Sequence, residues 1–407
     1  MEENTVLKYL ESDVADHIFT SKEEMEEYNR FRRERDKWII LPLNQVGAYG
    51  ISNLPLFVEE RAEKPVVKIN GFDQEVKQID LTSQENKECI QCTGLFLCVP
   101  TEDGYVALPT DGRSLTSIYQ RSDDFCGVMT RDNPKTGKMV LPIEEKAERV
   151  TRDNSLFSLF CKILFRDGKV RFSGSDQYTI ADNGELIRIL EEELQKQHPD
   201  MEYVEGAVSH EYLTAVYRLN NRMLEESLRI SLNDMGNDIH ELTSGVRFVT
   251  SDIGMSAVRA NVYLDLDGTR VFLKGIAVNH KDSELEDTFA ENLTKFGEVL
   301  KESEERIEQI GNVDVADVYG MVKMITEYYS TIFPSKVSEE VLNELPIRYP
   351  HGGTGIDVYL SLNDIINRHQ KLNQLSLART LDLQEQVAGL IYLPYDKLAS
   401  GEVVLKK

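Results

Sequence analysis

The stretch from Gly245 to Val278, GVRFVTSDIGMSAVRANVYLDLDGTRVFLKGIAV, decides the fold. Residues 256–266 and 269–278 alternate apolar and polar side chains, which is the pattern of strands that bury one face. Asp267-Gly268 lies between them, and an Asp-Gly pair is typical of a two-residue hairpin turn because glycine tolerates a positive φ. The apolar segment 245–250 precedes this hairpin as another strand. The sequence therefore predicts an antiparallel sheet here.

Strand and hairpin patterns recur on the N-terminal side of this stretch. Asp103-Gly104 and Asp167-Gly168 are two further turn signals of the same kind, each between apolar runs. Two helices are predicted among the strands: 22–36, which follows a Ser-x-x-Glu capping pattern, and 183–197, whose leucines and isoleucine share one face. Further strands are expected at 66–69, 92–99, 105–108, 169–172, 203–204 and 212–219.

The C-terminal third has the pattern of helices. A long helix is expected from Asp282 to Ile310, with ten acidic and three basic residues and a 4-3-4-3 spacing typical of a coiled-coil seam. An apolar edge of this length needs an apolar neighbour, either the next helix (315–332) or another chain. The seam consists of Phe289, Leu293, Phe296, Leu300, Ser303, Ile307 and Ile310, of which the first four are the candidate interaction surface. Later helices are expected at 338–345, 356–371 and 376–392.

Strands and hairpins come first and helices later, so the predicted class is α+β. The antiparallel, hairpin-rich sheets would fill the N-terminal and middle regions, and the last third would be helical. A chain of 407 residues is long enough for two or three domains. The changes of pattern suggest an N-terminal β-rich region with a surface helix (1–150), an α+β core with the 256–278 hairpin (151–281), and a helical region (282–407).

The chain is acidic, with 70 Asp and Glu against 46 Lys and Arg and a formal charge of −24. Nucleic-acid-binding proteins usually have a basic face, and no sizeable basic block is present, so direct nucleic-acid binding is expected to be weak. No run of about 18 apolar residues occurs, which argues against a membrane span. The N-terminus lacks the pattern of a secretory signal. The expected location is the cytoplasm, the host's if the protein is phage-encoded.

Cys89 and Cys92 form a C-x2-C pair, which can supply half of a zinc site. Cys98 and Cys126 follow at no regular metal spacing, and the sequence has no second C-x2-C or H-x3-H pair. Buried or incidental thiols are therefore the alternative, and we expect no ordered zinc site. Five cysteines, an odd number without a secretory signal, argue against a disulfide framework.

Glycines before a predicted helix form a second candidate site. Backbone N–H groups at a helix N-terminus can hold an anion, and the residues here are Gly352, Gly353, Thr354 and Gly355. The lysine of a Walker phosphate loop is missing, so a plain inter-helix loop is the alternative.

Carboxylates near strand ends form a third candidate site. Asp265 and Asp267 share one face of a strand beside a turn, and Asp252 follows the strand 245–250, so the three could hold Mg²⁺ or Ca²⁺. A hairpin turn and a capping role are the alternatives. No serine-nucleophile motif or other catalytic motif occurs. The catalytic residues are therefore unknown and no cofactor is implied. The sequence favours a protein that is not an enzyme.

The order of motifs between Tyr178 and Asp252 resembles a family carried by phages and plasmids, the domain of unknown function 932 family. The matching pieces are Tyr178 and Asn183, Gly206, 212–217 and Arg247-Phe-Val-Thr-Ser-Asp252. Thr250 stands where the family usually has Cys, and Asp252 where it usually has Asn. The Trp-His segment near the family's N-terminus is absent. The resemblance implies a mobile-element origin and no particular chemistry, because the activity of the family is not established.

Composition and resemblance lead to one main hypothesis, a phage or plasmid accessory protein that binds another macromolecule. The partner would be a protein, which could belong to the host, or a second copy of this chain. One alternative is a virion structural subunit of the shell type. Another is a recombination or strand-annealing protein, which would need a basic groove. The last is a metal-dependent hydrolase, which would need Asp252, Asp265 and Asp267 to converge within about 4–5 Å of one point.

Overall fold

The computed structural model describes residues 16–42, 45–50, 66–71, 74–80, 82–92, 95–102, 104–112, 114, 117–118 and 160–405. The described residues divide into two compact units. The first unit holds residues 16–29, 181–279 and 284–405, and the second holds the described residues of 30–180 together with 280–283. The helices of the C-terminal third thus belong with strands of the middle region, whereas the sequence predicted a separate helical region at 282–407.

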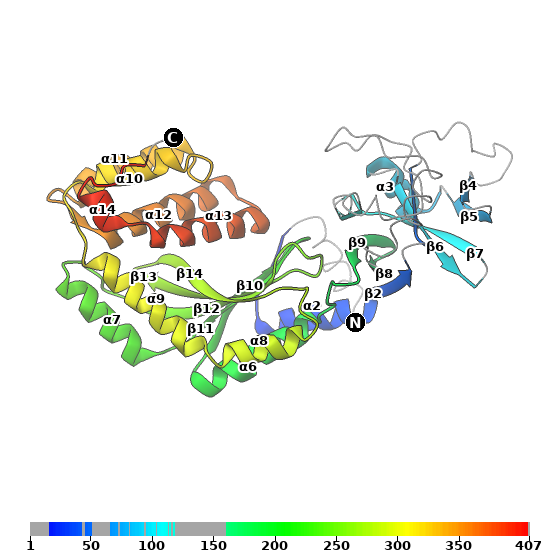
Figure 1. Cartoon of the computed structure of the whole chain (residues 1–407), viewed down its shortest axis with the longest axis horizontal. Helices are drawn as coiled ribbons and strands as arrows, with labels where there is room; N and C mark the ends of the chain where they lie inside the picture. The colour runs from blue at the N-terminus through cyan, green and yellow to red at the C-terminus, as the bar shows by residue number, and fades with distance from the viewer. Residues whose placement is uncertain are drawn as a thin grey trace. The chain divides into compact units, whose positions relative to one another are not determined.

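A six-stranded antiparallel sheet forms the centre of the first unit (Figure 1). In spatial order, its strands are β1 (His17–Phe19), β10 (Glu202–Val208), β11 (Leu213–Arg218), β12 (Leu242–Thr250), β13 (Val258–Leu266) and β14 (Thr269–Val278). Asp267 and Gly268 join β13 to β14 with φ angles of 49° and 81°, as a two-residue hairpin requires. The α+β class and the predicted 256–278 hairpin are confirmed.

Helices cover both faces of this sheet. Successive side chains of β12 point to opposite faces, and nearly all of them are buried. Phe248 points to one face, where its ring centroid lies 6.1 Å from that of Phe289. The helices on that face are α6 (Asn183–Gln197), α7 (Arg222–Asp234), α8 (Leu285–Leu293) and α9 (Phe296–Gly311). Arg247 points to the other face, which α12 (Gly355–Asn373) and α13 (Leu377–Gly389) cover (Figure 1).

The long helix expected from Asp282 to Ile310 is two helices, α8 and α9, separated at Thr294 and Lys295. Its apolar edge is buried inside the chain. Four of its residues are at most 2% exposed: Phe289, Leu293, Phe296 and Leu300. α8 packs on β14 and α6, and α9 packs on β14 and α7, rather than on the helix that follows. The expectation that these four residues form an interaction surface is therefore wrong, because the sheet and its neighbouring helices already cover them.

Glu304 on α9 is expected to make the stability of the first unit depend on pH. Burial, and then the charges of Glu308 and Glu305, raise the pKa of Glu304 to about 7, from an ordinary value of 4.5. A carboxyl group whose pKa is raised on folding stabilises the folded state at low pH. This contribution is lost as the pH rises through the pKa of the folded state, here about 7. Glu304→Gln, which is neutral at every pH, should therefore raise the unfolding temperature at pH 8 but not at pH 4.5. Equal effects at both pH values, or the same gain from the exposed Glu302→Gln, would contradict this role.

The remaining helices of the first unit follow α9 in the chain. They are α10 (Val318–Tyr328), α11 (Ser335–Arg348), α12, α13 and the short α14 (Tyr395–Ala399). α11 continues through Pro346, although the sequence predicted its end at residue 345. Within the described ranges, no helix is both long and apolar enough to cross a membrane.

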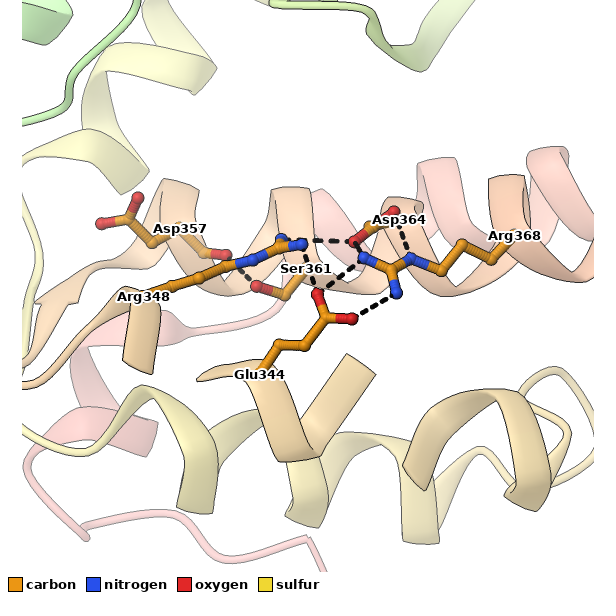
Figure 2. A network of polar contacts seen from close by, with 6 residues as sticks. All are labelled: Glu344, Arg348, Asp357, Ser361, Asp364 and Arg368. Atoms are coloured by element: carbon orange, nitrogen blue, oxygen red, sulfur yellow. Dashed lines mark hydrogen bonds and ion pairs between the residues drawn. The ribbon is translucent and has the colours of Figure 1, made fainter. Parts of the chain in front are cut away.

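Ion pairs join α11 to α12 (Figure 2). Arg368 lies 2.7 Å from Glu344 and 3.0 Å from Asp364, and Arg348 contacts the same two carboxylates at 2.6 Å and 3.3 Å. Two guanidinium groups therefore meet two carboxylates. This cluster holds the two helices together and has no net charge to offer a ligand.

Two sheets form the second unit. One contains β2 (Lys37–Pro42), β8 (Phe160–Arg166) and β9 (Lys169–Ser175), and the other contains β3 (Gly47–Gly50), β6 (Leu95–Thr101), β7 (Gly104–Pro109), β5 (Gln74–Asp80) and β4 (Val66–Gly71). The hairpins predicted at Gly104 and at Asp167-Gly168 are present, although Asp103 lies outside the described residues. The core of this unit includes Val46, Leu97, Val99, Cys161, Ile163 and Val170.

Candidate functional site

A groove with a volume of about 390 Å³ lies in the first unit, between the sheet face that carries Arg247 and the helices α12 and α13. Val216 of β11 and Phe272 of β14 line it from the sheet, and Leu381 and Gln384 line it from α13. The lining combines apolar side chains with polar and charged ones, and a concave cavity of this size is the usual form of a ligand site. The groove is therefore the candidate functional site.

Arg247 is the central polar residue of the groove. Its position on β12 directs it to the groove side of the sheet, where the side chain is buried with only 4% exposed. The guanidinium lies flat over Phe272, with Cζ 3.5 Å from the ring centroid. Its Nη1 donates a hydrogen bond to the side-chain oxygen of Gln384, and its buried Nε has no acceptor. Among the described residues, no carboxylate forms an ion pair with this cation.

Two arginines of the second unit are as buried as Arg247 but have carboxylate partners. Arg32 is 5% exposed and contacts the Asp167 carboxylate at 2.6 Å, and Arg166 is 5% exposed and is held by both oxygens of Asp36. Removing a guanidinium from water is costly unless an anion and hydrogen bonds compensate it. Arg32 and Arg166 have that compensation within the chain, whereas Arg247 has an amide oxygen and an aromatic ring.

The charge state of Arg247 reflects this environment. Burial, and then the neighbouring charge of Arg270, lower the pKa of Arg247 to about 9. The charges of Glu385 and Glu205 act in the opposite direction and favour the protonated form. The group therefore still carries its proton at neutral pH, and no carboxylate of the described residues forms an ion pair with it. A bound anion would restore the missing compensation.

α13 supplies a second buried polar atom to the groove. Thr380 is 5% exposed, and its Oγ1 has no hydrogen-bond partner, although its hydroxyl can both donate and accept. Thr380 stands one helical turn before Gln384 and lines the same groove. Buried polar atoms without partners are uncommon in folded proteins and call for an explanation such as a bound ligand or water. Two of them in one groove strengthen the assignment.

The rim of the groove carries balanced charges. Arg270 pairs with Glu205 and lies 3.9 Å from Asp265. Asp16 accepts a hydrogen bond from the backbone N–H of Leu377, at the start of α13. Arg247, Arg270 and one lysine face three carboxylates in the lining. The groove is therefore not a basic track of the kind that nucleic acids require.

The three aspartates proposed as a metal site are not brought together. Asp265 pairs with Thr243 near one end of β12, whereas Asp252 follows the opposite end of that strand. Six or more residues of strand, or about 20 Å, separate the two ends. The Asp267 carboxylate accepts hydrogen bonds from the backbone N–H groups of His240 and Glu241, which is a turn-stabilising role. Across the described ranges, no three metal-binding side chains gather in one place.

In the loop 352–355, the proposed anion site, backbone N–H groups already donate hydrogen bonds within the chain. Gly353 and Thr354 form the short strand β16, and Thr354 caps α12. The Asp357 carboxylate accepts a hydrogen bond from the Thr354 backbone N–H at 2.7 Å, and the Gly355 N–H donates to Val313. The residue that stands where an anion would bind is therefore Asp357, so the structure gives no support to an anion site there.

The cysteine pair lies on a helix rather than in a turn. Cys89 and Cys92 belong to α3 (Gln84–Cys92), which the sequence did not predict. The Cys89 sulfur is buried and accepts a hydrogen bond from the Thr110 backbone N–H at 3.4 Å. Cys98 is also buried, and burial raises the pKa of its thiol well above the ordinary range. Cys126 and the side chain of Cys92 lie outside the described part of the chain.

Sequence reasoning did not single out Arg247 as a functional residue. It appeared only as the first residue of the Arg-Phe-Val-Thr-Ser-Asp segment behind the family resemblance. A signal was present, because a charged residue stands in the middle of an apolar strand, Gly245 to Thr250. What the sequence could not show is that a helix more than 130 residues later supplies an amide and not a carboxylate.

No family model, curated protein or solved structure matches the chain. The resemblance to the domain of unknown function 932 family therefore stays a prediction. The assignment of a site depends on the geometry of the groove alone.

Proposed function

We propose that the protein acts by binding, and that the groove takes a ligand whose acidic group is neutralised by Arg247. The observation that supports this most strongly is a buried guanidinium that contacts Gln384 and Phe272 but no carboxylate of the part of the chain that the structure describes. Such a cation lowers the stability of the ligand-free fold. An anion that binds to it would therefore also stabilise the fold. The acidic group belongs to a small acid or is presented by a protein partner, as the hypothesis of a macromolecular partner requires.

The alternatives suggested by the sequence have less support. A metal-dependent hydrolase would need the convergence of Asp252, Asp265 and Asp267, which β12 and β13 keep apart. A strand-annealing protein would need a basic groove, and the lining of this groove is balanced in charge. A virion subunit and a phage or plasmid origin remain proposals that no contact in the described residues supports or opposes.

Anion-dependent stabilisation tests the proposed function. Thermal unfolding of the wild type would be followed in acetate, phosphate and sulfate, and in chloride at the same ionic strength. Anions also stabilise proteins without a site, so the readout is the difference between the wild type and Arg247→Met. We expect at least one anion to raise the wild-type midpoint more than it raises the midpoint of the variant. Equal shifts for every anion, including the carboxylates with apolar stems introduced below, would contradict the proposal.

A further inference from the structure

We infer that the acidic group is a single carboxylate carried on an apolar stem, and that the groove fits this class better than a phosphate; the inference rests on the proposed function. The carboxylate would lie against the Nε–Nη2 edge of the Arg247 guanidinium, where Nε has no acceptor. The stem would lie among the apolar side chains of the groove.

The orientation of Arg247 leaves one edge of its guanidinium for a ligand. The Phe272 ring covers a flat face at 3.5 Å, and Nη1 is engaged by Gln384. Nε and Nη2 form the remaining edge, and Nε is a buried donor without an acceptor. The two parallel N–H groups of such an edge match the two oxygens of a carboxylate, which is the geometry that makes arginine selective for planar anions.

The charges around the groove favour a ligand with one negative charge. Apart from Arg247, the lining has two cationic and three carboxylate side chains. Arg270 is already paired with Glu205 and lies near Asp265, and Asp16 stands on the same rim. A phosphate ester carries about −1.5 to −2 charges at pH 7, so its second charge would face these carboxylates. A carboxylate carries one charge, which Arg247 matches.

The apolar side chains of the groove would contact the stem of the ligand. Side chains from both walls contribute: Val216 and Phe272 from the sheet, and Leu375, Leu377 and Leu381 from the helical side. Leu375 and Leu377 are only half-buried, so a ligand that was only an anion would leave them partly in contact with water. Each methylene that becomes buried in such a lining is expected to tighten binding about fourfold, until the cavity is full.

Gln384 is the acceptor beside the proposed position of the carboxylate. Its amide oxygen accepts from Nη1 of Arg247 in the ligand-free protein, and an amide oxygen is a weaker acceptor than a carboxylate. The ligand's carboxylate, on Nε and Nη2, would therefore become the main acceptor of the guanidinium, with Gln384 still on Nη1. Gln384→Glu would supply the same carboxylate from within the chain and compete with any ligand.

Calorimetric titration of the full chain tests the ligand class. The probes are straight-chain alkanoates from acetate to octanoate, alkyl phosphates of the same lengths, and N-acetylated Leu-Leu dipeptides with a free or an amidated C-terminus. We expect alkanoates to bind more tightly than alkyl phosphates of equal length, with affinity rising with chain length. Tighter binding of the free-acid dipeptide than of any alkanoate would identify a protein terminus as the source, and the reverse would identify a free organic acid.

Variants place the binding in the groove. Arg247→Met and Gln384→Glu should each weaken alkanoate binding at least about 30-fold, whereas Gln384→Ala should bind as well as the wild type or better. Circular dichroism would confirm that each variant is folded. The two blocking variants change different elements, β12 and α13, and Gln384→Ala controls for the loss of the glutamine side chain. Alkyl phosphates that bind as tightly as alkanoates would overturn the carboxylate class and leave the proposed function intact. Absence of binding by every probe, or binding unchanged in Arg247→Met, would overturn both.

Discussion

Truncation of Phe296 to alanine is expected to lower the free energy of unfolding by about 3–5 kcal/mol, as is usual for an aromatic side chain in a packed core. Phe296 is fully buried at the start of α9, among the side chains that join this helix to the sheet. The loss would have two sources, the apolar area returned to water and the cavity left beside the sheet. Chemical denaturation followed by far-ultraviolet circular dichroism measures it.

Met223→Ala is the control for this prediction. Met223 lies on α7 and is 86% exposed, so its truncation should change the free energy of unfolding by less than about 0.5 kcal/mol. A loss below about 0.5 kcal/mol for Phe296→Ala, with an unchanged oligomeric state, would show that the seam is exposed in solution. In that case, the hypothesis that the seam forms an interaction surface would be supported.

Arg247→Met and Arg166→Met are expected to change stability in opposite directions, although both remove an arginine that is at most 5% exposed. Arg247 has no carboxylate partner within the described ranges. An apolar side chain of similar length therefore removes an uncompensated buried charge and should raise the free energy of unfolding by about 1–3 kcal/mol. Arg166 is held by Asp36, so its removal leaves a carboxylate without its partner and should cost about 3–5 kcal/mol.

The two variants lie in different units, which allows separate readouts. Trp38 is the only tryptophan of the chain and packs on Phe172 and Tyr178 in the second unit, so its fluorescence reports unfolding around Arg166. Circular dichroism reports mainly the helices, most of which belong to the first unit with Arg247. Destabilisation by Arg247→Met as large as that by Arg166→Met would mean that Arg247 is compensated in the ligand-free fold, and the argument for a missing anion would lose its basis.

Local signals in the sequence predicted elements whose structure depends on nearby residues. The helix α6 begins and ends where the sequence predicted, because Asp182 caps it and its leucines share one face. The hairpin of β13 and β14 followed from the alternation of its strands and from Asp267-Gly268. α7 was not predicted, although Leu224, Leu228 and Leu232 recur at helical spacing.

Features that depend on distant parts of the chain could not be predicted in the same way. The 4-3 spacing of Phe289 to Ile310 correctly indicated that this edge needs an apolar neighbour, but spacing does not say whether that neighbour is a helix, a sheet or another chain. The groove depends on the placement of α13 over the sheet, which brings Gln384 to Arg247 from more than 130 positions away. Arg247 could thus be seen in the sequence as an unusual strand residue, but its missing partner is visible only in the fold.

The direct test of the central claim is the NMR signal of the Arg247 Nε–H group during titration with hexanoate. The signal would be assigned by its absence in Arg247→Lys. A carboxylate that accepts from Nε should move the proton resonance downfield in a saturable way, with the same dissociation constant as calorimetry, and the shift should vanish in Gln384→Glu. A hexanoate complex that forms by calorimetry while the Arg247 Nε–H resonance stays in place would show that the acid binds elsewhere, and the assignment of the groove would be wrong.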